Sequence, residues 1–519
     1  MSPTLLFTFV FGYFLLLLGV AWYTSRNSNN ETFFIGNRSS NWMLVAFGMI
    51  GTSLSGVTFV SVPGTVGIGG FGYFQVVIGY FLGYFVVAFI LLPMYYKMNL
   101  TSIYSYLLQR FGFTSYKTGA LFFIISRTLG ATARLYLVIN VLQIFILDEM
   151  HVPFGLTTFI ILLMILLYTF EGGVRTIVFT DTLQTSFMLI GLLVCVTYIM
   201  HQLNLSLSDT WAVLKSHKYN TLINTDYKSS GYFLKSLLGG AFITIAMTGL
   251  DQEMMQKNIS VHNLRDSQKN MISLSVLQGV VVFIFLVLGG LLYLFALNKG
   301  AAFDQGMVGG KPQMQFLLDN KNILGDNLFP QIAFNYLPPI IGIIFILGLI
   351  SALFPSADGA LTALTSSFCI DIIGLKRNES WNEKQKKKIR MTVHITFAVI
   401  FFLCVIIFKW IDNKSIIDII LKLAGYTYGP LLGLFSFGIF TKRRLPESVA
   451  VPALCLIAPA ICYYISDNAA NWFNGFQIGI ELLILNGLLT FIGLFIISKK
   501  PYTSSDTELE HELVQKQKL

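Results

Sequence analysis

A carboxylate interrupts one of the most apolar parts of this chain. Asp181 follows the stretch Tyr168-Thr-Phe-Glu-Gly-Gly173, between two strongly apolar segments. An ionised carboxylate inside a bilayer is costly unless it meets a cation, a hydrogen-bond donor or water, so we treat Asp181 as a candidate functional group. It could bind a cation, helped by the neighbouring Thr180 hydroxyl, or it could cap a helix or pair with Arg175.

A second polar cluster lies in the apolar run from 348 to 367. Pro355 has no amide proton, so the carbonyl of Ser351, four residues earlier, is left free. This carbonyl, the Ser356 hydroxyl and the Asp358 carboxylate are hard oxygen ligands, which suit Na⁺ as they suit Mg²⁺ and Ca²⁺. The alternative is a kinked helix that packs on small residues. Because Asp358 follows the kink directly, we favour the ion site.

Three hydroxyl groups lie in or beside another interrupted run, Gly51-Thr-Ser-Leu-Ser-Gly56. Ser53, Ser55 and Thr58 could ligate a cation or hydrogen-bond a solute. Close packing of small residues between helices is the alternative.

Two arginines lie in the fourth apolar run, seven residues apart and so on nearly the same helix face. Arginine cannot shed its proton, so within a membrane it must face a partner or water. A two-point grip of Arg127 on a solute carboxylate would offset its desolvation. The alternative for Arg127 is an ion pair with an acid such as Asp251 or Asp358. We assign no role to Arg134, the second of the two arginines.

The acidic residues at 251–253 approach a basic segment, 257–269. We expect Glu253 to be an interfacial loop charge, while the place of Asp251 stays open.

The composition limits the class of protein. Of the 519 residues, 55% are hydrophobic and 12% charged, which is typical of a polytopic membrane protein. The net charge of +9 comes from lysines and arginines scattered among loops, which argues against nucleic-acid binding. We predict thirteen spans, which begin near residues 3, 41, 71, 116, 152, 176, 233, 270, 332, 390, 414, 446 and 475.

Loop charges predict the orientation. One set of alternate loops carries roughly three times as many lysines and arginines as the other, and such residues stay on the cytoplasmic side. We therefore expect the N-terminus outside and the C-terminus inside. The polar tail from 499 to 519 is not expected to fold by itself.

Three spans are interrupted by glycine, proline or polar residues, at 51–56, 247–252 and 425–430. Broken helices at membrane depth are tolerated where they line a cavity or bind an ion. The second and seventh spans are five apart, as expected for the first helices of two inverted five-helix repeats.

The chain resembles the sodium/solute symporter family over nearly its whole length. The most specific signature is Tyr-Thr-x-x-Gly-Gly followed by Thr-Asp-x-x-Gln, at 168–184. Supporting features are Asn41-Trp42, the serine- and alanine-rich ninth span that closes with Asp371-Ile372, and Gly429-Pro430. The resemblance implies an all-α, leucine-transporter-type fold of two inverted repeats.

The implied organisation has five parts. They are an N-terminal helix and loop at 1–40, the first repeat at 41–205, the second repeat at 206–440, two peripheral helices at 441–498, and the tail at 499–519.

The resemblance also implies a Na⁺ site between the second and ninth spans. It would use the backbone of Gly51, Leu54 and Ala352 together with the Ser356 hydroxyl. The family normally has two adjacent hydroxyl residues where this chain has Pro355-Ser356, so a side-chain ligand is missing. Asp358 or the freed carbonyl at 351 could replace it, or the coupling could differ.

A second Na⁺ site known in some members would contain Asp181, with Pro355, Asp358 and Gly359 at positions where hydroxyls are usual. Two close carboxylates repel each other, so Asp358 beside Asp181 would make a more anionic site or hold a proton. A proton-coupled mechanism therefore stays open.

For the solute, the resemblance is to the sialic-acid-transporting branch. Tyr80 stands where a pocket glutamine is usual, and Gln75 is more than a turn away. Met247 replaces the aromatic residue of the galactose-type branch. The implied solute-binding residues are Ser53, Ser55, Thr58, Arg127, Gln75 and Tyr80.

We therefore predict a monomeric, multi-pass transporter of the plasma membrane, surrounded by lipid, that couples Na⁺ influx to uptake of a small, polar, anionic solute such as sialic acid or another acidic sugar. The alternatives are proton-coupled transport of a monocarboxylate or sugar, and a sensor that binds without transport. A membrane enzyme finds no support, because no HExxH, Ser/His or Cys/His arrangement is present.

Overall fold

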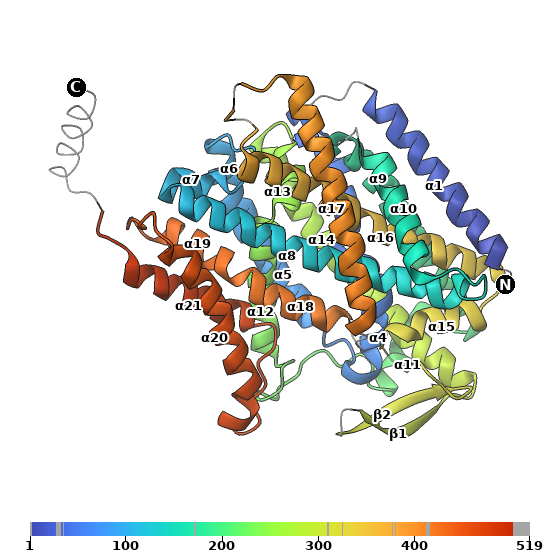
Figure 1. The fold of residues 1–519 in the computed structure, drawn as a ribbon. Coiled ribbons are helices and arrows are strands. Elements are labelled where there is room, and N and C mark those ends of the chain that lie inside the picture. Colours follow the sequence, from blue (N-terminus) through green and yellow to red (C-terminus); the bar gives the residue numbers. More distant parts are fainter. Residues whose placement is uncertain are drawn as a thin grey trace, which may run out of the picture.

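The computed structural model describes residues 3–26, 33–34, 36–170, 173–308, 311–323, 325–375, 377–378, 380–411 and 416–501. This part of the chain is mostly helical, as the apolar runs predict. Helix α1 lies at one edge of the helical body, and α20 and α21 lie at the opposite edge (Figure 1).

The first half of the chain forms helices and short helical turns. They are α1 (Pro3–Ser25), η1 (Gly36–Arg38), α3 (Trp42–Ser53), α4 (Gly56–Gly69), α5 (Phe74–Val86), η2 (Val87–Leu91), α6 (Leu92–Lys97), α7 (Ser105–Phe111), α8 (Phe113–Leu142), η3 (Gln143–Leu147), α9 (Phe154–Thr169) and α10 (Gly173–Gln202).

The second half adds further helices around a short sheet. They are α11 (Leu207–Ser216), α12 (Phe233–Thr244), η4 (Ile245–Gly249), α13 (Gln252–Ile259), α14 (Leu264–Asn298), η5 (Gly325–Asn327), α15 (Leu328–Asn335), α16 (Pro339–Ser367), η6 (Phe368–Ile373), α17 (Glu383–Ile411), α18 (Ile416–Thr427), α19 (Gly429–Phe440), α20 (Ala450–Trp472) and α21 (Leu482–Ile497).

Eight helices in the described ranges are long and apolar enough to cross a bilayer, or up to eleven if each of three bent pairs counts as one span. Helices α9 and α21 are shorter but also apolar. Helices begin close to the predicted positions, for example at Phe154 and Phe233. The total of thirteen spans, the orientation of the termini and the repeat boundaries stay predictions, and the tail beyond residue 501 lies outside the described residues.

The three bent pairs lie where the sequence predicts interruptions. Helices α3 and α4 meet at 57°, α12–η4 and α13 at 63°, and α18 and α19 at 42°. At the second break, Asp251 caps α13 by accepting hydrogen bonds from the amides of Glu253 (2.9 Å) and Met254 (3.3 Å). Such a cap satisfies amides that a helix start leaves without partners.

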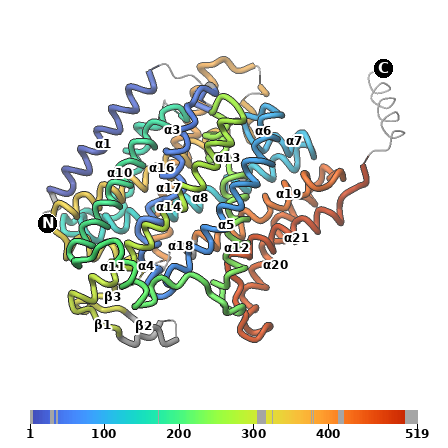
Figure 2. Tube along the Cα trace, turned by 180° about the vertical axis from the view of Figure 1, so that it is seen from behind, coloured from blue at the N-terminus to red at the C-terminus, as the bar shows by residue number. Residues whose placement is uncertain are grey.

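Helix α16 is the most enclosed of the long helices, and every residue from Gly348 to Ser367 is buried. Helices α3, α8 and α10 pack against it, and Figure 2 shows it inside the bundle behind α10. The helix continues through Pro355. The Ser351 hydroxyl donates to Tyr13 Oη on α1 at 2.8 Å.

The segment between α14 and α15 departs from the all-α prediction. It forms an antiparallel sheet of β1 (Ala302–Val308), β2 (Lys311–Leu318) and β3 (Lys321–Asn322), in that order. Phe303 pairs with Phe316, and their rings meet edge to face at 4.5 Å between centroids. Phe316 also meets Tyr293 on α14 at 5.3 Å. These aromatic contacts are tertiary, so the loop composition did not reveal them.

Helices α5 and α12 approach each other through glycines. A Cβ at Gly79 would collide with the Leu237 carbonyl, and one at Gly240 would collide with the Val76 carbonyl. Because the obstacles are backbone atoms, a larger side chain could not be accommodated by a change of rotamer.

Gly240→Leu should therefore destabilise the protein by about 1–3 kcal/mol, the usual effect of overpacking. Gly279→Leu on α14 is the matched control, because a Cβ there meets nothing within 4 Å. Thermal unfolding of the two purified variants in detergent tests this, and equal melting temperatures would contradict the packing.

Candidate functional site

Glu253 lies at the centre of a buried charge cluster. Its Oε2 forms a short ion pair with Arg127 Nη2 on α8, and its Oε1 lies 3.7 Å from Lys257 Nζ, one turn along α13. All three side chains are at most 5% exposed. The expectation that Glu253 is an interfacial loop charge is wrong. The i,i+4 spacing of Glu253 and Lys257 on one helix was the sequence signal that could have shown their pairing.

Asp251 completes the surroundings of Arg127. Its Oδ2 lies 3.9 Å from Arg127 Nη1 and accepts a 2.6 Å hydrogen bond from Tyr428 Oη, at the break between α18 and α19. Of the two roles left open for Arg127, the structure therefore shows an ion pair with acids of the chain. A solute carboxylate would have to displace Glu253 to reach the same guanidinium.

Lys257 also reaches the helix that carries Asp181. Its ammonium donates to Asp181 Oδ2 on α10 and to Thr52 Oγ1 on α3, both at 2.7 Å. Thr52 in turn donates to the same carboxylate oxygen at 3.3 Å. Asp181 is therefore partnered by Lys257, which belongs to the basic segment 257–269, whereas Arg175 is exposed.

The second acid expected at the ion sites, Asp358, is held by two donors. Tyr168 Oη donates to Oδ2 at 2.7 Å, and the Gly359 amide donates to Oδ1 at 2.5 Å. Asp358 lies within electrostatic reach of Asp181 and Lys257. The structure thus gathers Tyr168 and Asp181 of the signature around α16, while residues 171 and 172 lie outside the described ranges.

A glycine allows this approach. A Cβ at Gly359 would collide with Glu253 Oε1 and lie 3.1 Å from Lys257 Nζ. The missing side chain at Gly359 leaves room for both charged groups of α13 to lie against the backbone of α16.

The other predicted Na⁺ site lies where the α3 break faces α16. A Cβ at Gly51 would lie 3.4 Å from Pro355 Cγ, so the two segments are in contact. The Leu54 amide donates to Ile50 at 2.7 Å. Ser356 donates its hydroxyl proton to Leu353, which leaves its oxygen lone pairs available.

These residues fit a small cation in type and place. Ala352 and Ser356 are buried one turn apart on α16, opposite the broken end of α3. Carbonyl and hydroxyl oxygens are the donors that hard cations prefer. Their role as Na⁺ ligands stays a prediction.

The predicted solute residues lie at the α3–α4 break, on α8 and on α5. Ser53, Ser55 and Thr58 lie at the α3–α4 break, where Ser53 has no hydrogen-bond partner within the described part of the chain. A Cβ at Gly56 would collide with Val138 of α8. The α4 side of the break therefore contacts α8 at a residue that lies about one helical turn after Arg134 along the helix.

Arg134 is the second arginine of α8. We find no hydrogen bond or ion pair to it among the described residues. It lines a narrow hollow, with room for about one water molecule, together with Arg127, Met247 and Tyr428. A guanidinium beside this hollow is a group that an anionic solute could engage.

The two predicted solute residues of α5, Tyr80 and Gln75, have different partners. The Tyr80 hydroxyl lies 3.2 Å from Tyr73 Oη. Gln75 instead donates to the Gly72 carbonyl at 2.9 Å and accepts from the Asn224 amide at 3.3 Å. Its side chain thus holds a loop in place.

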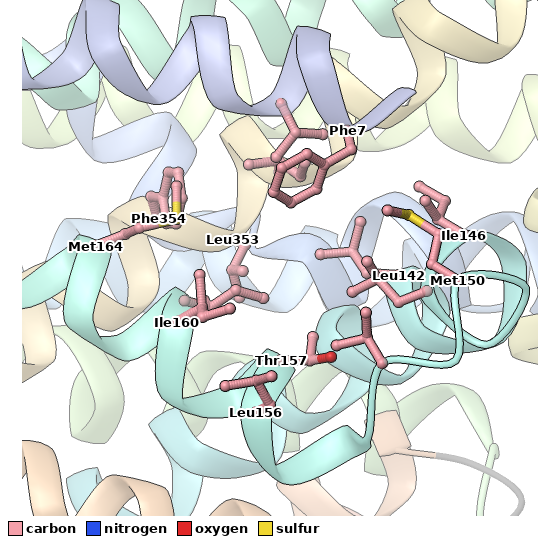
Figure 3. Close-up of a pocket in the computed structure, with 15 residues that line it drawn as sticks. Phe7, Leu142, Ile146, Met150, Leu156, Thr157, Ile160, Met164, Leu353 and Phe354 are labelled. Carbon is pink, nitrogen blue, oxygen red and sulfur yellow. The ribbon is translucent and has the colours of Figure 1, made fainter. Parts of the chain in front are cut away.

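A larger cavity, of about 170 Å³, lies elsewhere, between α1, α9 and α16. Figure 3 shows its walls, formed by side chains such as Phe7, Leu353 and Phe354. Thr157 is the one polar residue of its lining, and its hydroxyl already donates to Gln143 at 2.6 Å. The cavity therefore suits an apolar chain and offers nothing to a charged solute.

Comparison with known proteins agrees with this architecture. The model of the sodium:solute symporter family matches residues 33–451. The chain is 23% identical over 489 residues to the sodium/sialic acid symporter SiaT of Proteus mirabilis, with 93% of each chain covered. It is 24% identical over 424 residues to the sodium-coupled monocarboxylate transporter 1 of Mus musculus, which covers 79% of this chain and 64% of that protein.

Solved structures show the fold. A substrate-bound, outward-open Na⁺-coupled sialic acid symporter superposes with a TM-score of 0.77, at 19% identity, and the match covers 95% of this chain and 97% of that one. The nucleobase-cation-symport-1 transporter Mhp1, in a closed conformation, superposes with a TM-score of 0.53 at 12% identity, covering 91% and 95%. The predicted leucine-transporter-type fold is confirmed at this level. The chain belongs to the sodium:solute symporter family, and it is a multi-pass transport protein of the plasma membrane rather than an enzyme.

Proposed function

We propose that this chain is a secondary active symporter that couples Na⁺ influx to uptake of a small anionic solute, with sialic acid or another acidic sugar first among the candidates. The observation that carries the proposal is the match to Na⁺/sialic acid symporters along nearly the full length of both chains. Na⁺ is the coupling ion of the family.

The energetics suit the proposal. One Na⁺ that moves inward down a potential of 100 mV releases roughly 2.3 kcal/mol. A monoanionic solute that moves inward with it gives this energy back, so coupling to a single Na⁺ draws on the Na⁺ concentration gradient, in which each factor of ten supplies about 1.4 kcal/mol.

The geometry supports a carboxylate-bearing solute, and it moves the expected anchor from Arg127 to Arg134. Arg127 is paired with Glu253 and Asp251, whereas Arg134 lines the hollow and forms no ion pair with any residue in the described ranges. In this proposal, Tyr80 and the hydroxyls at the α3–α4 break bind the rest of a polar solute. The hollow holds little more than a water, so a solute would enter only when α18 and α8 separate.

A first prediction concerns transport itself. Purified protein in liposomes should accumulate radiolabelled sialic acid when Na⁺ is high outside, and should not do so when choline replaces Na⁺. The panel should include monocarboxylates and a pH gradient without Na⁺, which test the proton-coupled alternative. Binding without uptake or counterflow would indicate a sensor and contradict the proposal.

A second prediction concerns the solute anchor. Arg134→Gln should weaken binding of the anionic solute by about 10- to 100-fold, the loss of a charged hydrogen bond, while binding of its neutral methyl ester changes little. Arg265→Gln, at an exposed arginine of α14, is the control. Calorimetric affinities of the acid and the ester test this, and an equal loss for both ligands would show that Arg134 acts only through folding.

A third prediction concerns the ion. Ser356→Ala should raise the half-saturating Na⁺ concentration by about tenfold, equivalent to about 1.4 kcal/mol, because it removes one oxygen ligand. Ser275→Ala on α14 is the matched control, since its buried hydroxyl also donates to the carbonyl three residues earlier. Overlapping Na⁺ activation curves for the two variants would show that Ser356 is not a Na⁺ ligand.

A further inference from the structure

The Lys257 ammonium occupies the kind of position that a small cation would take. It lies between α3, α10, α13 and the α16 backbone, with 2.7 Å contacts to Asp181 Oδ2 and Thr52 Oγ1. The side chain is 3% exposed and the Asp181 side chain 1%, so neither charge is neutralised by bulk water.

The oxygens around this ammonium form a ligand set for a hard cation. They comprise a carboxylate of Asp181, a hydroxyl of Thr52 and a carboxylate of Glu253 at 3.7 Å. Asp181 Oδ1 is buried and has no hydrogen-bond partner in the described part of the chain. A buried carboxylate with one oxygen left over is a group that a cation would stabilise.

The charge requirement at Asp181 is already met by the chain itself. Lysine is a compact point charge on a flexible stem, and it can replace a monovalent ion wherever its stem can reach. The helical spacing from Glu253 and the missing side chain at Gly359 give the stem that reach.

We propose that Lys257 is a tethered cation that takes the place of a Na⁺ at Asp181. The chain therefore binds one Na⁺, at the α3–α16 site. Without the lysine, Asp181 would bind a second Na⁺. The inference rests on the proposed Na⁺ coupling for the first ion. The exchange of ammonium for Na⁺ at Asp181 depends only on the side chains of this protein.

The stoichiometry has an electrical consequence. One Na⁺ carried with one monoanionic solute moves no net charge, whereas two Na⁺ would move one. Uptake by the wild-type protein should therefore be insensitive to an imposed membrane potential.

The closing experiment counts bound Na⁺ directly, by isothermal calorimetry and by ²²Na⁺ binding to purified protein, without transport. The wild-type protein should bind one Na⁺ and Lys257→Gln should bind two. The double variant Lys257→Gln/Asp181→Asn should return to one, because the new site needs the free carboxylate. Lys257→Arg keeps the charge and should not gain an ion.

Two results would overturn the inference. One is a folded Lys257→Gln variant that binds no more Na⁺ than the wild-type protein. The other is loss of a Na⁺ in Asp181→Asn, which would mean that Asp181 already holds an ion beside Lys257. If Lys257→Gln does not fold, Asp181→Asn decides alone, and an unchanged Na⁺ count there supports the inference.

Failure of the proposed function gives a different pattern. A wild-type protein that binds no Na⁺ would remove Na⁺ coupling, yet a single Na⁺ gained by Lys257→Gln would still support the exchange at Asp181.

Discussion

A charged side chain that is buried away from water in a bilayer needs an opposite charge beside it. Glu253 shows how this protein meets that requirement. Its carboxylate stands between Arg127 of α8 and Lys257 of its own helix, and Lys257 continues to Asp181 of α10. Removal of one member would leave another buried charge without a partner, which typically costs 3–5 kcal/mol. The relative positions of α8, α10 and α13 are thus set by electrostatic compensation as well as by packing.

The breaks in the helices make this compensation possible. Because the seventh span stops at Gly249 and restarts at Gln252, a new helix start forms inside the protein, and Asp251 caps it. The turn redirects α13 by 63°, which brings Glu253 and Lys257 against Gly359 of α16. The break between η4 and α13 therefore orients Lys257, the residue that we propose takes the place of a Na⁺.

Much of this could be predicted from the sequence, because hydropathy and glycine- or proline-rich interruptions are local signals. The starts of the helices, the three breaks and the candidate status of Asp181 and Asp358 follow from residue type and spacing. The partners could not be predicted in the same way. The i,i+4 spacing could have paired Glu253 with Lys257, but their contacts with Arg127 and Asp181 depend on the break that turns α13 inward. The sheet that pairs Phe303 with Phe316 likewise depends on a contact with α14 that has no local signature.

A tethered cation changes what the carrier can do. A lysine cannot cross the membrane, so each Na⁺ that it replaces removes roughly 2.3 kcal/mol per 100 mV of driving force, or about fiftyfold in the attainable solute gradient. The same lysine keeps Asp181 neutralised after the solute and the mobile ion have left. An empty carrier that must return across the membrane would otherwise expose an unpaired buried carboxylate, which is the costlier state. Lys257 therefore lowers the solute gradient that the carrier can reach and makes the return of the empty carrier easier. This suits a solute that is abundant outside the cell or consumed quickly within it.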